Sequence, residues 1–190
     1  MVHLEPLAVW SHAKYIQKPV VKVIGKENKV YLANGQTVDY DVLVINVGSR
    51  TRDSYTTPGV WEHALTTRPI NDLLPKIENK ENELMREGII PDVVVVGGGA
   101  AGTELSFAFK ARWTKYFGRE INVRILTSQD GPIPYDPLAT RKMVFKLMKD
   151  YRITIEKMCR VKEVTKNSVI LEDGRVFKCD VCVWATGAEP

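Results

Sequence analysis

Histidine and cysteine, the residues that most often build metal centres, are scarce in this 190-residue sequence, with three of each. His3, His12 and His63 are scattered along the chain and show no metal-ligand spacing. We therefore predict no metal site, and we expect each histidine to be a surface or packing residue rather than a catalytic base. An odd number of cysteines without a secretory signal argues against a disulfide framework and favours a reducing, intracellular compartment.

Long hydrophobic runs and blocks of one charge sign are also missing. No apolar run approaches the roughly 20 residues of a membrane-spanning helix, and the start of the sequence shows no signal-peptide pattern. The 27 Lys and Arg against 23 Asp and Glu leave a net charge of +4 that is spread along the chain. We predict a soluble protein with no membrane span, and the charge pattern does not imply nucleic-acid binding.

Two of the cysteines, Cys179 and Cys182, form a C-x-x-C pattern that could be a redox dithiol or a pair of packing residues. The neighbouring run Val181–Ala185 is predicted as a buried strand, and residues three apart on a strand point to opposite faces. A redox C-x-x-C usually lies at a helix N-terminus, where the thiolate is stabilised. We therefore favour the packing interpretation.

The beginning of the chain is predicted to form a small antiparallel ribbon. Asn34-Gly35 is typical of the turn in a β-hairpin. Three runs are predicted as strands: Val20–Ile24, Val30–Leu32 and Val42–Val47. From Ser49 to Gly59 the composition shifts to Ser, Thr, Arg, Pro and Gly, which predicts a linker or an interdomain loop.

Two helices, the first of them a surface helix, are predicted from apolar residues at helical spacing. The first runs from Ile70 to a stop at Gly88, and Pro75 is expected to kink or split it. The second runs from Pro137 to Asp150, with Val144, Leu147 and Met148 facing inward.

A glycine-rich segment between these helices predicts a strand–loop–helix–strand unit. Val93–Val96 is a continuous β-branched run, typical of a central parallel strand buried on both faces. "GGGAAG" follows at once and contains G-x-G-x-x-G; Thr103–Phe117 is then predicted as a helix, and Ile121–Thr127 as the next strand. The fold class predicted is therefore α/β, with a Rossmann-like βαβ unit and an antiparallel β-ribbon.

The three spaced glycines have separate roles in a dinucleotide site. Gly97 permits the tight turn, Gly99 lets the backbone approach a pyrophosphate, and Gly102 lets the helix pack on the strand. The N-terminus of the helix offers free N–H groups to the anion. We predict that this segment binds a dinucleotide; the alternative is a purely structural glycine turn.

The residue that usually selects between NADH and NADPH is missing from its expected place. A dinucleotide fold commonly carries an acidic residue at the end of the second strand to bind the ribose hydroxyls. Here that position falls at Thr127, followed by Ser128 and Gln129, and the next arginine is Arg141. The sequence does not choose between the two nucleotides.

Two segments of this chain have similar sequences: "KVYLANGQTVDYDVLVINVGS" and "SVILEDGRVFKCDVCVWATGA". Identical residues at one fixed spacing indicate an internal duplication. They pair Val30 with Val169, Gly35 with Gly174, Asp41 with Asp180 and Gly48 with Gly187. Only the second copy is preceded by a glycine-rich loop, so we expect the sequence to be part of a longer chain whose natural start is not Met1.

This duplication, closed by "YDVLVINVGS" and "CDVCVWATGAEP", resembles the pyridine nucleotide-disulfide oxidoreductase superfamily of flavoproteins. The resemblance implies that residues 1–58 are part of an FAD domain and that residues 59–190 form an inserted NAD(P)H domain. The chain lacks a C-x-x-x-x-C active-site pair and carries "HALTTRPINDLL". It is therefore most similar to the branch of type II NADH dehydrogenases, apoptosis-inducing factor and the oxidoreductase module found with selenide, water dikinase.

The resemblance also implies a set of cofactor-binding residues. They are Gly97, Gly98, Gly99, Ala100, Ala101, Gly102, Glu104, Thr127, Ala185, Thr186 and Gly187 for NADH or NADPH, and Gly48 for FAD. Three places depart from the pattern, and the first is Thr127, which replaces the usual acidic partner of the ribose. Ala108 stands where type II dehydrogenases usually have a second glutamate, which weakens a quinone-reducing role, and Asn46-Val47 replaces the commoner Ala-Thr before Gly48.

The function implied is hydride transfer from NAD(P)H to FAD, for which the protein orients the two rings and needs no nucleophile or metal of its own. The partner predicted from the sequence is a small-molecule dinucleotide; the electron acceptor and the choice between cytoplasm and mitochondrion stay open. Two other hypotheses remain: a non-enzymatic module that senses nucleotide, and a scaffold with a degenerate site. The piece alone is expected to be inactive.

Overall fold

The computed structural model describes residues 3–189, which divide into two compact units. The first unit ends at Val47 and the second begins at Gly48. Our assignment of residues 1–58 and 59–190 to parts of two functional domains stays a prediction. None of the helices in the described part of the chain combines the length and the apolar character that a membrane crossing requires.

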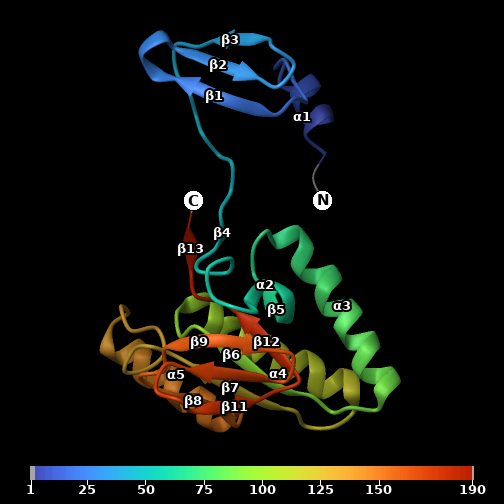
Figure 1. The fold of residues 1–190 in the computed structure, drawn as a ribbon, viewed down its shortest axis with the longest axis vertical. Helices are drawn as coiled ribbons and strands as arrows, with labels where there is room; N and C mark the ends of the chain where they lie inside the picture. Colours follow the sequence, from blue (N-terminus) through green and yellow to red (C-terminus); the bar gives the residue numbers. More distant parts are fainter. Residues whose placement is uncertain (1–2, 190) are drawn as a thin grey trace. The chain divides into compact units, whose positions relative to one another are not determined.

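The first unit contains a three-stranded antiparallel ribbon in the order β1-β2-β3, but its third strand is Thr37–Asp39 and not the predicted Val42–Val47 (Figure 1). Gly35 turns the chain between β2 and β3 with a φ of 84°. The elements are α1 (Leu4–Trp10), β1 (Val20–Ile24), a short 3-10 helix (Gly25–Glu27), β2 (Lys29–Leu32) and β3 (Thr37–Asp39).

The predicted strand Val42–Val47 is wrong, because these residues take no strand conformation. Val42 and Val47 are 82% and 90% exposed. The matching segment of the second copy is β12 (Val181–Trp184), which is buried between two parallel neighbours. Within residues 3–189 no strand pairs with Val42–Val47, and an apolar run without a paired neighbour cannot form a sheet.

The second unit contains a five-stranded parallel sheet in the order β5-β12-β6-β7-β8, as the predicted α/β fold requires. Its central strand β6 contains the Val93–Val96 run, and all four valines are buried. The strands are β5 (Ala64–Thr66), β6 (Asp92–Val96), β7 (Asn122–Leu126), β8 (Ile153–Glu156) and β12 (Val181–Trp184).

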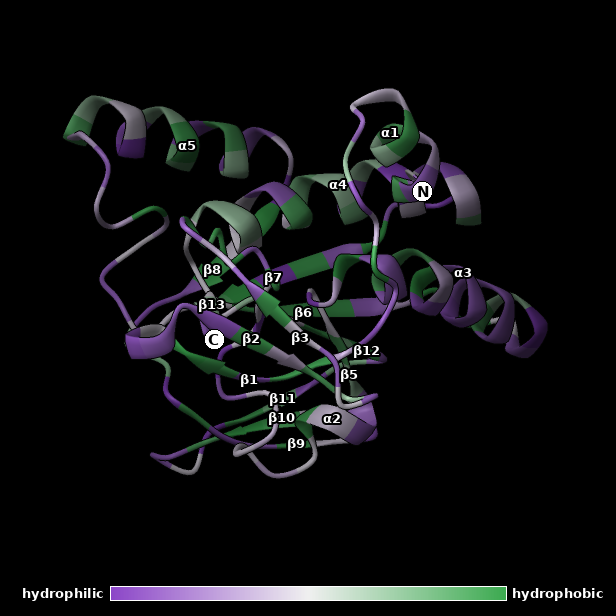
Figure 2. Ribbon diagram, turned by 90° about the horizontal axis from the view of Figure 1, so that it is seen from above, coloured by the Kyte–Doolittle hydropathy of each residue, from purple (hydrophilic) through white to green (hydrophobic). Residues whose placement is uncertain are grey.

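Different elements cover the two faces of this sheet, as Figure 2 shows. On one face, Leu84, Trp113 and Met148 from three helices pack on alternate strand residues. The other face packs against an antiparallel ribbon and a short helix. The helices are α2 (Val60–His63), α3 (Ile70–Glu87), α4 (Ala100–Phe117) and α5 (Leu138–Asp150), and the ribbon is β9 (Val161–Thr165), β10 (Ser168–Leu171) and β11 (Val176–Lys178).

The duplication seen in the sequence is repeated in the backbone. Strands β10 and β11 occupy the same positions in the second copy that β2 and β3 occupy in the first. Gly174 has a φ of 86°, and its N–H bonds to the carbonyl of Leu171 as that of Gly35 bonds to Leu32. The repeated sequence therefore specifies a repeated hairpin in each unit.

Three local predictions need correction. Helix α3 is continuous through Pro75, although a proline in the second turn removes the N–H that would bond to the carbonyl of Asn71. Leu147 is 41% exposed, so only Met148 of its helix is fully buried. The Ser49–Gly59 segment is not a free linker: it carries β4 (Arg50–Thr51), which pairs with β13 (Ala188–Glu189), and Thr51 is buried.

The prediction that Cys179 and Cys182 point to opposite faces of a strand is also wrong, although both side chains are packed as expected. Cys179 precedes β12, so strand alternation does not apply, and it lies with Cys182 in the core between the sheet and the ribbon. Both are free thiols, as is Cys159. Burial raises the pKa of Cys179 to about 12 and that of Cys182 well above its ordinary value, so both stay protonated at neutral pH.

A buried carboxylate joins helix α3 to helix α4. Glu81 is 3% exposed and accepts two hydrogen bonds from Arg112, at 2.6 and 2.8 Å, and one from the indole N–H of Trp113 at 2.6 Å. The hydrogen bonds from Arg112 hold the pKa of this carboxyl below its ordinary value of 4.5. The ionised form is therefore stabilised in the folded state.

Glu81→Gln is expected to cost about 1–3 kcal/mol of unfolding free energy at neutral pH, because it removes a charged acceptor from a buried indole. The pKa of Glu81 is lowered on folding, so its contribution is complete above 4.5 and is lost as the pH falls through the lower, folded value. Urea unfolding at several pH values measures both effects. Glu83→Gln, at a partly exposed position of the same helix, is the control and should change stability by less than about 0.5 kcal/mol. An equal pH dependence in the native chain and Glu81→Gln would contradict this account.

Candidate functional site

A cavity of about 760 Å³ lies at the carboxyl ends of the central strands. Its lining comes from residues 96–101 after β6, 126–129 after β7 and 184–187 after β12. From β6 the chain continues to β7 on one side, while β12 lies on the other, so this edge of the sheet is a topological switch point. Open α/β sheets bind their ligands at such points, and the volume suits a small organic ligand.

Gly97 and Gly102 are required by packing. Gly97 has a φ of 120°, and a Cβ there would stand 2.2 Å from the carbonyl oxygen of Ala185. A Cβ on Gly102 would stand 2.0 Å from the carbonyl oxygen of Gly97. These two glycines therefore let the loop, the helix and β12 approach one another, in the way predicted for the tight turn and for helix packing.

Gly99 differs from these two glycines, because the space that a side chain would take there is empty. A Cβ at Gly99 would meet nothing within 4 Å, and its φ of −74° is available to any residue. Gly99 is the N-cap of α4, so the first N–H groups of an 18-residue helix point toward the cavity without partners inside the helix. The helix dipole and these N–H groups together favour an anion at this point.

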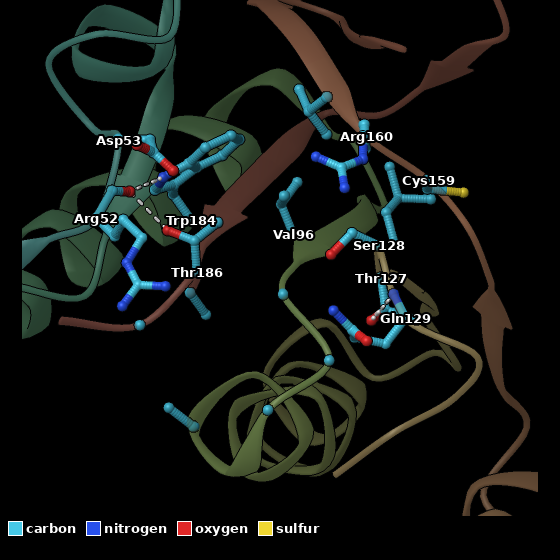
Figure 3. Close-up of a pocket in the computed structure, with 18 of the residues that line it drawn as sticks. Arg52, Asp53, Val96, Thr127, Ser128, Gln129, Cys159, Arg160, Trp184 and Thr186 are labelled. Atoms are coloured by element: carbon cyan, nitrogen blue, oxygen red, sulfur yellow. Dashed lines mark hydrogen bonds between the residues drawn. The ribbon is translucent and has the colours of Figure 1, made fainter. Parts of the chain in front are cut away.

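The predicted linker forms one wall of the cavity. The carbonyl oxygen of Arg52 accepts hydrogen bonds from the indole of Trp184 at 2.8 Å and from the hydroxyl of Thr186 at 2.6 Å. Figure 3 shows both bonds. The pairing of β4 with β13 holds the same segment, and Arg52, Asp53, Thr56 and Thr57 line the cavity.

Thr127 directly follows β7, and its side chain is buried and already hydrogen-bonded within the protein. It is 2% exposed, and its hydroxyl accepts a hydrogen bond from the Gln129 N–H at 3.2 Å. A Cβ on Gly98 would stand 2.5 Å from this hydroxyl, so Thr127 packs under the glycine loop. The exposed groups at this end are Ser128 and Gln129.

Most of the predicted site residues meet at the cavity. Gly97, Gly98, Gly99, Ala100, Ala101, Thr127, Ala185, Thr186 and Gly187 all line it. Gly102 lies beneath it, and Glu104 lines a neighbouring cavity of about 630 Å³ together with Ala108. Gly48 lines neither cavity. Whether each residue contacts a cofactor stays a prediction.

Sequence reasoning missed four charged residues of the cavity: Arg52, Asp53, Arg160 and Glu172. Arg160 follows β8 and Glu172 follows β10, both far along the chain from the glycine loop. The segment of Arg52 carried only the composition of a loop. No motif in the sequence marks any of the four.

The cavity is also lined by the thiol of Cys159, whose thiolate form is disfavoured. Burial raises the pKa of Cys159, and its Sγ lies 3.3 Å from the carbonyl oxygen of Lys157. Within residues 3–189 there is no group of three His, Cys, Asp or Glu side chains that could hold a metal ion. The arrangement is suited to binding an extended anionic ligand, with its phosphates at the start of α4.

Comparison with known proteins agrees with this geometry. Residues 9–190 match the family described as pyridine nucleotide-disulphide oxidoreductase. The chain is 29% identical over 204 residues to a probable NADH dehydrogenase of Dictyostelium discoideum, covering 92% of this chain and 44% of the relative. It is 24% identical over 205 residues to the type II NADH:quinone oxidoreductase of Haemophilus influenzae, covering 92% and 45%.

A solved structure shares the fold over nearly the whole chain. NDH2 from Plasmodium falciparum, in complex with NADH, superposes with a TM-score of 0.72 at 22% identity, covering 92% of this chain and 41% of that one. At this identity the likeness shows the fold alone. The chain spans less than half the length of the two curated relatives.

Proposed function

Because the chain belongs to the pyridine nucleotide-disulphide oxidoreductase family, we propose that its cavity binds NADH or NADPH in an FAD-dependent oxidoreductase. The observation that carries this proposal is the contrast among the three glycines. At Gly97 and Gly102 the space that a Cβ would need is taken by protein backbone. At Gly99 that space is open, at the start of α4. A purely structural glycine turn has no need of that open space.

The glycine loop and the N-terminus of α4 would hold the pyrophosphate, and the 184–187 segment would hold the middle of the dinucleotide against the sheet. Gly97 bonds through its N–H to Leu126 and Ala185 through its N–H to Val96, so both backbones are fixed before a ligand arrives. Such preorganisation orients a reacting ring without cost at the moment of reaction.

The neighbouring cavity is proposed for the reactive end of the nucleotide. It shares Ala101, Ala185 and Gly187 with the first cavity and adds Glu104. A carboxylate there could accept a hydrogen bond from an amide or a ribose hydroxyl. Bound flavin would supply the hydride acceptor, and the residues of this chain would orient the nicotinamide and exclude water. Gly48, with φ of 79° and open space around it, is proposed to lie against FAD.

Calorimetric titration of the 190-residue chain with NADH tests the proposal. One saturable site is expected, and ADP should compete for it because ADP carries the same pyrophosphate and ribose. The fluorescence of Trp184, which lines the cavity, should change in parallel. A folded sample that releases no heat with NADH or NADPH would overturn the nucleotide site and favour a degenerate scaffold. Nucleotide binding without turnover in the complete flavoprotein would favour a sensing module instead.

A further inference from the structure

The ribose end of the cavity carries no acidic residue on β7. In a Rossmann-type site the adenosine ribose lies at the carboxyl end of the second strand, where an acid selects NAD and an arginine accommodates the 2′-phosphate of NADP. Here that end offers the neutral Thr127, Ser128 and Gln129. Thr127 is already used in packing, so its two neighbours are the groups available to a ligand.

The β8–β9 connection, distant from β7 in the sequence, brings the cationic side chain of Arg160 to this end of the cavity. The Cys159 N–H bonds to the carbonyl of Thr127 at 2.8 Å, and the Met158 N–H bonds to the carbonyl of Gln129 at 3.2 Å. These bonds fix the start of the β8–β9 connection beside the end of β7. Arg160 follows directly and lines the cavity, and Figure 3 shows its guanidinium on the same side of the cavity as Ser128.

The guanidinium of Arg160 is available to a ligand. Among residues 3–189 it forms no ion pair, and its side chain donates no hydrogen bond to protein. Two other arginines near this end are already paired: Arg141 with Asp130 at 2.7 Å, and Arg175 with Asp173 at 2.8 Å. Arg141, the next arginine along the chain after β7, is therefore already neutralised by a partner and is not the cation offered to a ligand here.

Two carboxylates line the cavity and could oppose an anion. Asp53 belongs to the wall formed by the Arg52 segment, away from Arg160 in Figure 3. Glu172 lies closer, since its N–H bonds to the carbonyl of Arg160 at 2.9 Å. The Glu172 carboxylate could accept a hydrogen bond from a ribose hydroxyl. It would then favour NADH, whereas Arg160 would favour NADPH.

We infer that Arg160 makes this site selective for NADPH over NADH by binding the 2′-phosphate of the adenosine ribose, with Ser128 as a second donor. The inference rests on the proposed function. A guanidinium presents a planar fork of donors that matches a phosphate, and the neutral end of β7 does not repel the added charge. The hydrogen bond from the Glu172 N–H fixes the backbone of Arg160, and in this inference the Glu172 carboxylate does not decide the preference.

Calorimetry of the 190-residue chain with both nucleotides tests this inference. NADPH is expected to bind roughly tenfold tighter than NADH, the typical gain from one charge-assisted contact. Arg160→Gln should remove that advantage while changing NADH affinity less than about twofold. Arg141→Gln, which removes a cation already paired with Asp130, is the matched control and should leave the NADPH to NADH ratio unchanged.

The outcomes separate this inference from the proposed function. If neither nucleotide binds the folded chain, both fail together. If NADH binds at least as tightly as NADPH, or if Glu172→Gln and not Arg160→Gln changes the ratio, only the assignment of Arg160 fails. Adenosine 2′,5′-bisphosphate should displace NADPH, and inorganic phosphate at equal concentration should not. Displacement by phosphate alone would mean a simple anion site and would overturn the inference.

Discussion

Replacing Gly99 with valine is expected to abolish dinucleotide binding and leave the fold nearly unchanged. The valine side chain would extend from the N-cap of α4 into the open space of the cavity, where the pyrophosphate must approach the first N–H groups of the helix. The φ of −74° suits valine, and the loss of a favourable N-cap residue costs less than about 1 kcal/mol. We expect NADH and NADPH affinity to fall by more than roughly a hundredfold, measured by calorimetry.

Gly25→Val is the matched control for this variant. Gly25 also has open space where a Cβ would stand and no left-handed φ, but it lies outside the lining of the cavity. The same chemical change should therefore leave nucleotide affinity intact. Retained binding in Gly99→Val, with a normal unfolding curve, would show that the pyrophosphate does not lie at the start of α4.

Gly97→Ala is expected to have the largest effect on stability. The new Cβ would stand 2.2 Å from the Ala185 carbonyl oxygen, so strand β12 or the glycine loop must move. A φ of 120° adds strain that non-glycine residues rarely accept. Overpacking and strain each cost about 1–3 kcal/mol, so we expect a loss of about 3–5 kcal/mol, close to the whole stability of many domains.

Two alanine variants divide this effect into its parts, with urea unfolding as the measurement. Gly174→Ala places alanine at a φ of 86° with nothing within 4 Å, so it should show strain without overlap and cost about 1 kcal/mol. Gly99→Ala has neither strain nor overlap and should unfold almost as the native chain does. Equal stability of Gly97→Ala and Gly174→Ala would mean that the contact with Ala185 is not tight.

Part of the site could be predicted because its signal is local. The turn at Gly97, the opening at Gly99 and the free N–H groups of α4 all arise within a few consecutive residues, and a backbone that must approach an anion tolerates few side chains. The β-branched run at Val93–Val96 likewise predicts a strand that is buried on both faces. Such features depend little on what the rest of the chain does.

Other predictions failed where the outcome depends on partners. Val42–Val47 and Val181–Trp184 occupy equivalent places in the repeat, yet only the second is a strand, because only the second pairs with neighbouring strands. The segment at Arg52 has the composition of a loop, and it becomes a wall of the cavity through hydrogen bonds with Trp184 and Thr186. Local composition cannot report a contact made more than a hundred residues away.

By itself the sequence determined the α/β fold class, the duplication of the hairpin and the position of the glycine loop, since each follows from short-range periodicity or from residues required by backbone geometry. Only the tertiary structure decided that Thr127 is packed and that Arg160, which forms no ion pair within residues 3–189, lines the cavity together with Ser128. The physical reason is that hydrogen bonds between the ends of β7 and β8 join segments whose distance along the chain carries no pattern.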